Sequence, residues 1–205
     1  MSALRRASRL MSEAEYLEFE RSSEIKHEYL NGNVFDMTGA SRAHNLISGN
    51  VFASLHRQLR GKSCEVYHSD MRLKVSATGL YTYPDISVVC GEAQFRDEQL
   101  DTLLNPTLIV EVLSPPTERY DRGKKFQHYR ELDSLRELVL ISQDSPIIER
   151  YVRQAEGKWL LRDAKGLDAT LELTSIGCKL SLAEIYEQVS FTNEEDLSLD
   201  EDLPN

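Results

Sequence analysis

The pattern of apolar and polar positions along the chain predicts helices near both ends and strands between them. Ser12 and Glu15 stand three residues apart ahead of an amphipathic stretch, a capping-box pattern that predicts a helix over residues 12–22. The segment HEYL-NG-NVFDM predicts two strands joined at Asn31-Gly32, because this dipeptide favours the tight turns of β-hairpins. The first part of the chain therefore predicts a helix followed by a hairpin.

Helical spacing returns in the segment RAHNLISGNVFASLHRQLRG. Its apolar positions recur at about the helical period: Leu46, Ile47, Phe52, Leu55 and Leu59. Gly61 supplies a C-terminal stop for this helix. The short apolar runs CEVYH, MRLKV, ISVVC and TLIVEVL then predict four strands.

The second half of the chain adds a helix, three strands and a last short helix. ERYDRGKKFQHYREL predicts a helix whose first turn Gly123 weakens. ELVLIS is continuously apolar, so we expect a central strand buried on both faces. IIERYV and KWLLRDA predict an antiparallel pair with a turn at Glu156-Gly157, and Ser181 with Glu184 forms a second capping-box pattern. This order predicts an α/β (α+β) fold in which helices flank a mixed central sheet.

Length and charge define the domain organisation. The chain has 205 residues, which suits one domain with a sizeable core, and we assign residues 1–192 to it. Residues 193–205 hold six acids and no base, so we expect an acidic, disordered tail. The net charge is −10, and near −4 without this tail. That balance argues against a broad DNA-coating surface, and any nucleic-acid contact must come from local basic clusters.

The cellular compartment is predicted from three features that the sequence lacks: membrane spans, a signal peptide and a CxxC cysteine pair. No apolar run approaches the roughly 20 residues that span a bilayer, and the N-terminus has no apolar core of signal-peptide length. Cys64, Cys90 and Cys178 are far apart and odd in number, without a CxxC pair. We therefore expect reduced core thiols and a cytoplasmic protein without membrane contact.

Two acids interrupt apolar strands and carry the candidate chemistry. Asp85 follows Pro84 and opens the run ISVVC, and Glu111 stands inside the run from Leu108 to Leu113. Burying a carboxylate costs several kcal/mol unless a cation or hydrogen-bond donors compensate. Two acids at the ends of neighbouring strands therefore suggest a shared Mg²⁺ or Mn²⁺, hard cations that prefer oxygen ligands. The backbone carbonyl of Val112 is a candidate third ligand.

The helix after Glu111 offers a basic partner. Lys125 could orient a water or stabilise charge on a phosphoryl group, as metal-assisted phosphodiester hydrolysis requires. Asp121 and Tyr129 stand four residues on either side and share its helix face. We place Asp121 and Tyr129, with the basic Arg122 and Lys124, among the substrate-binding candidates. The alternative for Asp121 and Lys125 is a surface ion pair of little consequence.

Glu28 and His44 are further catalytic candidates. Glu28 stands in the hairpin ahead of the turn, and His44 near the start of the following helix. Each alone is more often structural, as a hairpin acid or a helix-capping histidine. They gain weight only if the fold brings both to the same end as Asp85 and Glu111.

Three segments together resemble a known family. The pattern HEYLNGNVFDMTGASRAHN, YTYPDISVVCG and PTLIVEVLSPPTERYDRGKKFQHYRELDSLRELVLI is similar to the Uma-type "putative restriction endonuclease" family of the PD-(D/E)XK nuclease superfamily. The resemblance covers roughly residues 10–190, and its most specific part is EVLSP…YDRGKK…Y. It implies a restriction-endonuclease-like core and divalent-metal-dependent DNA cleavage.

The resemblance also implies roles for individual residues. Asp85 matches the first acid of the motif and Glu111 the second. Leu113 stands where the superfamily usually has lysine, and Lys125 matches the lysine that the Uma-type pattern carries on the following helix. Asp121 and Tyr129 match its flanking positions, Glu28 its hairpin acid and His44 the histidine of its next helix.

Three functions compete at this point. The first is a metal-dependent DNA endonuclease, supported by Asp85, Glu111 and Lys125. The second is a catalytically weak nuclease-fold protein that binds nucleic acid or regulates, which the net acidity favours. The third is a small-molecule binding domain on the same sheet, for which the one positive feature is the pocket that these acids would line. If one site per subunit cuts both DNA strands, we expect a two-fold homodimer.

Overall fold

The computed structural model describes residues 10–37 and 39–191. The predicted acidic tail at 193–205 lies outside these residues. Within them, no helix is both long and apolar enough to cross a membrane.

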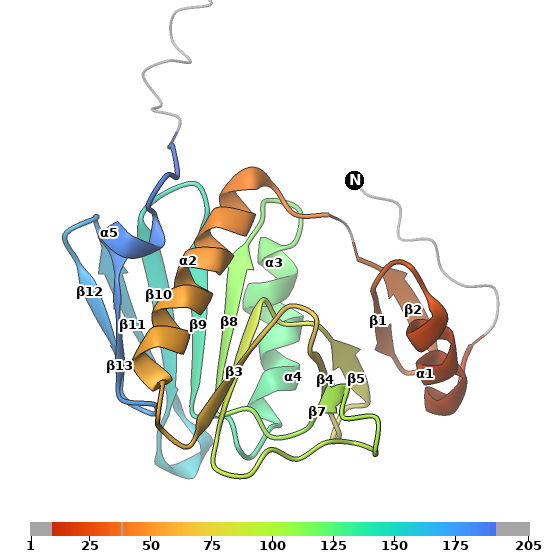
Figure 1. Cartoon of the computed structure of the whole chain (residues 1–205). Coiled ribbons are helices and arrows are strands. Elements are labelled where there is room, and N and C mark those ends of the chain that lie inside the picture. Colours follow the sequence, from red (N-terminus) through yellow and green to blue (C-terminus); the bar gives the residue numbers. More distant parts are fainter. Residues whose placement is uncertain (1–9, 38, 192–205) are drawn as a thin grey trace, which may run out of the picture.

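A mixed six-stranded sheet forms the centre of the molecule (Figure 1). Its strands, in spatial order, are β11 (Trp159–Lys165), β10 (Ile147–Arg153), β9 (Glu137–Ser142), β8 (Leu108–Leu113), β6 (Ile86–Cys90) and β3 (Cys64–His68). β8 and β9 run parallel, and every other neighbouring pair is antiparallel. This confirms the predicted mixed sheet, with ELVLIS as a strand buried on both faces in its interior.

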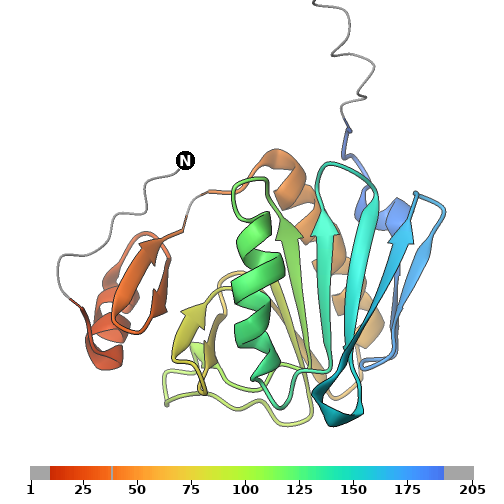
Figure 2. The ribbon, with the colours of Figure 1, turned by 180° about the vertical axis from the view of Figure 1, so that it is seen from behind.

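Helices cover both faces of this sheet. α2 (Arg42–Leu59) lies on one face in Figure 1, and the helix between β8 and β9 lies on the other, in front in Figure 2. This second helix consists of α3 (Glu118–Tyr120), a π-helical turn η1 (Asp121–Lys125) and α4 (Phe126–Arg130).

Side chains alternate between the two faces along β8, so the strand contributes to two cores. The even-numbered residues Leu108, Val110 and Val112 pack in one cluster with apolar residues of α2. Ile109 and Leu113 pack in a second cluster. The alternation therefore points Glu111 toward the face that the α3–α4 helix covers.

A second sheet lies beside the first. Its order is β2 (Asn33–Asp36), β1 (His27–Leu30), β5 (Leu80–Thr82), β4 (Arg72–Val75) and β7 (Thr102–Leu103). Sequence patterns predicted the β1–β2 hairpin and β4 but missed β5 and β7, whose two or three residues are too short for a periodicity signal.

The hairpin turn has the backbone conformation that its residues favour. Asn31 and Gly32 both have positive φ, 48° and 86°, as a type I′ turn requires. A Cβ on Gly32 would also stand 2.9 Å from the Cβ of Leu10, so the close approach of the N-terminal segment requires glycine as well.

The capping box predicted for the first helix is confirmed, and the one predicted for the last helix is wrong. α1 (Glu13–Ser22) begins with a complete capping box between Ser12 and Glu15. α5 (Leu182–Ile185) also forms, but the side chain of Ser181 makes no cap hydrogen bond. The carboxylate of Glu184 instead accepts from Arg57 and Ser54 of α2. Before α5, β12 (Thr170–Leu173) and β13 (Cys178–Ser181) form a hairpin that the sequence patterns did not predict.

The expectation of three reduced thiols is also wrong. Cys64 and Cys90 form a disulfide between β3 and β6, and only Cys178 is a free, buried thiol. The two cysteines stand directly opposite each other in the antiparallel register, with Cα atoms 4.0 Å apart. Their separation of 26 residues hides this pairing in the sequence, because only the strand register brings them together.

Reduction of this disulfide should lower stability. The bond closes a loop of 26 residues, for which chain-entropy arguments give about 3.5 kcal/mol. For a chain of this size we expect the melting temperature to fall by about 7–14 °C when a thiol reductant is present. A Cys64→Ala/Cys90→Ala variant should melt equally with and without reductant. An unchanged parental melting temperature after complete reduction, verified by thiol titration, would contradict a stabilising role.

Candidate active site

Seven of the residues singled out in the sequence meet at the end of β8, between the two sheets. They are Glu28, His44, Asp85, Glu111, Asp121, Lys125 and Tyr129. They come from β1, α2, the residue before β6, β8, the π-helical turn and α4. The condition stated for Glu28 and His44 is therefore met, since both reach the cluster that contains Asp85 and Glu111.

Glu111 and Lys125 form the centre of the cluster. The Lys125 ammonium lies 2.9 Å from Glu111 Oε1, and the hydroxyl of Tyr129 donates to the same oxygen at 2.6 Å. All three side chains are buried, with exposed fractions of 5%, 5% and 1% for Glu111, Lys125 and Tyr129. Oε2 of Glu111 takes part in neither contact. The interpretation of Lys125 as a surface residue is therefore wrong.

The π-helical turn brings Lys125 to this position. Lys125 Nζ also lies 3.6 Å from Asp121 Oδ1 and 3.5 Å from Glu28 Oε1, so one ammonium faces three carboxylates. π-helical turns insert an extra residue into a helix and often occur at functional sites. Gly123, at the centre of this turn, has open space where a Cβ would stand.

Asp85 is held by the backbone of β8 and by a side chain of α2. Its Oδ2 accepts from the backbone N–H of Val112 at 2.7 Å and lies 3.1 Å from Nε2 of His44. Burial lowers the pKa of His44, but the hydrogen bond and charge of Asp85, with Glu111 and Asp121 beyond it, raise it overall. His44 therefore carries a proton more readily than an ordinary histidine and stabilises the Asp85 carboxylate.

Glu28 depends on partners that the sequence patterns did not identify. Thr82, on the neighbouring strand β5, donates a short hydrogen bond to Glu28 Oε1. Continuing the Tyr29↔Tyr81 register places Thr82 directly opposite Glu28. Burial, followed by the charge of Glu28, raises the pKa of the Tyr120 phenol. The only available signal was the position of Thr82 just ahead of the YPD motif, and that required β5 to be recognised as a strand.

The cluster carries more negative than positive charge. Burial raises the pKa of Glu111 to about 8 despite Lys125, and the charges of Asp85 and Asp121 add to the increase. Burial likewise raises the pKa of Asp121. Burial would lower the pKa of Lys125, but the surrounding groups, Glu111 above all, raise it well above its usual value. One lysine therefore does not neutralise the four carboxyl groups, and a further cation would stabilise their ionised forms.

The donor set fits a hard divalent cation with few protein ligands. In residues 10–37 and 39–191, no three histidine, cysteine or acidic side chains are placed to hold a metal ion together. Mg²⁺ is commonly bound through one or two carboxylates and keeps several waters. Asp85 Oδ1 and Glu111 Oε2 are the oxygens outside the contacts described above. They suit such a cation, with the carbonyl of Val112 as the predicted third ligand.

Comparison with known proteins identifies the family. Residues 13–204 match the Uma2 family, described as "Putative restriction endonuclease". The chain belongs to the Uma2 family. The resemblance noted in the sequence is thereby confirmed.

Relatives of this Uma2 protein include "Uncharacterized protein slr1290" from Synechocystis sp., 38% identical over 181 residues, which cover 88% of this chain and 94% of the relative. "Uncharacterized protein sll1609" from the same organism is 33% identical over 167 residues, which cover 82% of this chain and 94% of the relative. The crystal structure of a "putative nuclease belonging to DUF820" from Anabaena variabilis matches with a TM-score of 0.72 and 19% identity, covering 88% of this chain and 99% of that one. This similarity confirms the predicted fold, a mixed central sheet flanked by helices.

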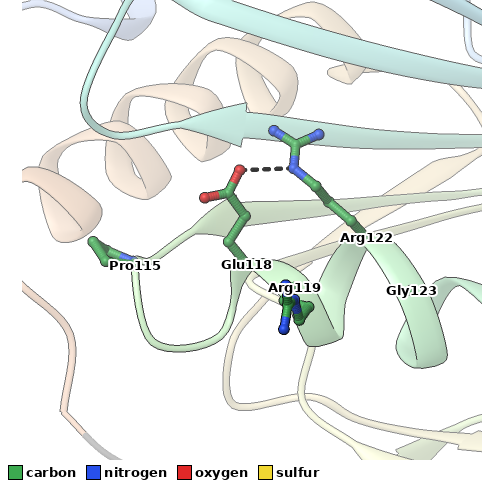
Figure 3. A pocket seen from close by; sticks show the side chains of 5 residues that line it. All are labelled: Pro115, Glu118, Arg119, Arg122 and Gly123. Atoms are coloured by element: carbon green, nitrogen blue, oxygen red, sulfur yellow. Dashed lines mark hydrogen bonds and ion pairs between the residues drawn. The ribbon is translucent and has the colours of Figure 1, made fainter.

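A shallow pocket of the Uma2 protein opens beside the cluster, on the first turns of the same helix. Figure 3 shows its lining residues: Pro115, Glu118, Arg119, Arg122 and Gly123. Arg122 donates to Glu118 at 2.7 Å and makes a short contact with Glu149 of β10, so two carboxylates already engage its charge. Lys124 is exposed one residue before the buried Lys125. The substrate-binding roles of Arg122 and Lys124 remain predictions.

The raised pKa of Glu111 predicts a pH-dependent stability. Between the ordinary value of 4.5 and the folded value of about 8, the folded protein binds more protons than the unfolded chain. Its stability therefore falls as the pH rises through this window. Glu111→Gln removes the titrating group, so the melting temperature of the variant relative to the parent should increase from pH 5 to pH 8. Glu184→Gln, at an exposed position of α5, is the control, and a pH-independent difference for Glu111→Gln would refute this electrostatic account.

Proposed function

We propose that this Uma2 protein is a divalent-metal-dependent DNA endonuclease. The observation that carries the proposal is the buried Glu111–Lys125 pair at 2.9 Å, beside Asp85 and within a cluster of excess negative charge. A structural ion pair needs no additional carboxylates around it. An excess of carboxylates with one lysine suits a site where a metal ion and a phosphodiester meet.

Each residue of the cluster has a separate role in this reaction. A divalent cation held by Asp85, Glu111 and the carbonyl of Val112 would act as a Lewis acid on the phosphodiester. Lys125 stabilises the negative charge that develops on the phosphoryl oxygens, and its burial strengthens this electrostatic interaction. Tyr129 orients Glu111 through its hydrogen bond to Oε1.

The remaining groups hold these residues in position. Glu28 and Asp121 keep Lys125 charged and oriented, because both carboxylates lie within 4 Å of its ammonium. His44 fixes Asp85 through Nε2. The substrate contact proposed for Lys124 falls on the exposed surface of the same helix, where a cation can meet the DNA backbone. The second proposed contact, Arg122, is half-buried and already pairs with Glu118 and Glu149.

One such site cuts one DNA strand. Cleavage of both strands by this protein therefore favours two copies acting together, and we propose a two-fold dimer for that case. Plasmid DNA distinguishes the outcomes, since a nicking enzyme yields open circles and a double-strand cutter yields linear product.

The two strand acids should bind Mn²⁺ together. Asp85→Asn or Glu111→Gln removes one ligand charge, so we expect Mn²⁺ affinity to fall at least about tenfold, about 1.4 kcal/mol, by isothermal calorimetry. Glu149→Gln, an acid that pairs with Arg122 outside the cluster, is the matched control and should bind Mn²⁺ as the parent does. Parental affinity in both Asp85→Asn and Glu111→Gln would disprove a shared metal site.

Lys125 should act on the chemical step. We expect Lys125→Met to lower the rate of DNA cleavage by about two orders of magnitude or more, the scale of losing one electrostatic stabiliser. Because Lys125 is a buried ion-pair partner, its removal also costs about 3–5 kcal/mol of stability, so the folded fraction must be measured in parallel. Lys125→Arg keeps the charge with a different geometry and should fold better while remaining slow.

Lys124→Met is the matched control for this experiment. Lys124 is exposed on another side of the helix, so its loss should weaken salt-dependent DNA binding and leave the chemical step unchanged. Parental cleavage by the Lys125 variants would remove Lys125 from the mechanism. A parent that binds DNA and Mn²⁺ but cuts no duplex, single-stranded or branched DNA would instead support a nuclease-fold binding protein, the function that the net charge of −10 favours.

A further inference from the structure

A second buried polar network lies next to the candidate active site. Its centre is Glu20 of α1, whose side chain is 2% exposed. Glu20 Oε1 accepts from the backbone N–H of His27 at 2.9 Å and from the hydroxyl of Tyr83 at 2.8 Å. Its Oε2 lies 2.8 Å from Nδ1 of His27. One carboxylate thus binds two segments that are far apart in the sequence.

Arg72 of β4 supplies the positive charge of this network. Its guanidinium is 3% exposed and donates to the hydroxyl of Tyr83 at 3.1 Å, to Thr102 at 3.0 Å and to Asp101 at 2.9 Å. Buried charges are costly unless they are paired and hydrogen-bonded. Here the Tyr83 hydroxyl connects Glu20 to Arg72, so the network holds these three groups in one defined arrangement.

Both segments that Glu20 holds lead directly into the cluster. Glu28 follows His27 in β1, where alternation buries His27 and Tyr29 on one face and turns Glu28 toward Lys125. Asp85 follows Tyr83 across Pro84, whose ring restricts the backbone between them. A movement of His27 or Tyr83 would therefore displace a cluster carboxylate.

We propose that Glu20 is a positioning residue of the active site, fixing Glu28 and Asp85 relative to each other by holding His27 and Tyr83 together. The proposal rests on the nuclease function above for its catalytic consequence. Glu20 touches neither Lys125 nor Glu111 and acts only through the two chain segments.

The packing of α1 has other supports, so Glu20 is not needed merely to attach this helix. The ring of Tyr16 stacks on Tyr29 at 4.8 Å, and its hydroxyl donates to the carbonyl of His27. Arg21 pairs with Asp97 at 2.8 Å. The contacts of Glu20 are distinct from these because they reach the residue before Glu28 and the segment before Asp85.

Two variants test the proposal, each with a different risk to folding. Tyr83→Phe removes only the hydroxyl between Glu20 and Arg72, and Glu20→Gln removes the carboxylate charge. Tyr29→Phe is the matched control, because it deletes a buried hydroxyl of β1 that bonds to Met11 outside the network. Melting temperatures of all variants establish how much each change costs the fold as a whole.

The decisive readout is hydrogen exchange at the amide of Val112, which donates to Asp85 at 2.7 Å. We expect Tyr83→Phe and Glu20→Gln to accelerate this exchange about tenfold or more while Val110 in the same strand keeps its parental rate. In DNA cleavage, kcat should fall about tenfold at nearly constant KM. Tyr29→Phe should leave the exchange rate and kcat at parental values.

Parental exchange at Val112 in both network variants would overturn the proposal. Equal acceleration in Tyr29→Phe would also overturn it, since that result indicates general loosening of the fold. If the parent cuts no DNA, the nuclease function fails, while the exchange rate at Val112 still decides whether Glu20 positions Asp85.

Discussion

The site depends on one buried ammonium ion surrounded by carboxylates. Lys125 lies 2.9 Å from Glu111 and within 4 Å of Glu28 and Asp121, and it is 5% exposed. Without it, several negative charges would share a region with little water, at a cost that only protonation could relieve. Because Lys125 alone does not balance these charges, burial still raises the pKa of Glu111 to about 8. The same imbalance makes the site receptive to a metal ion.

The fold satisfies this constraint by bringing four parts of the molecule together: the first sheet, the crossover helix, the second sheet and α2. β8 carries Glu111 on the face covered by α4, and the crossover helix between β8 and β9 returns Lys125 and Tyr129 over the same strand. The hairpin of the second sheet adds Glu28. α2 lies on the opposite face of the first sheet and contributes His44, which contacts Asp85 just before β6. Each element contributes between one and three polar groups, and none forms the site alone.

The position of the lysine follows from packing. The superfamily resemblance implies a lysine two residues after the second acid, where this chain has Leu113. Leu113 is 4% exposed and packs in the cluster that includes Tyr129 and Leu140. The face of β8 next to Glu111 is therefore filled by an apolar side chain. The ammonium comes instead from Lys125 in the π-helical turn, and it contacts the Glu111 carboxylate from the helix side of the sheet.

The sequence by itself determined the elements whose signals are local. The capping box of α1, the Asn31-Gly32 turn, the long helix α2 and the apolar strands β8 and β9 all follow from short-range patterns. The two acids inside apolar runs and the helix stripe of Asp121, Lys125 and Tyr129 were visible for the same reason.

Only the tertiary structure decided which of these groups meet. The Cys64–Cys90 bond, the Thr82 contact to Glu28 and the burial of Lys125 depend on strand register and on crossing distances between elements. Residues far apart in the chain carry no local signal of these contacts, because side-chain periodicity reports the face of an element and not its partner.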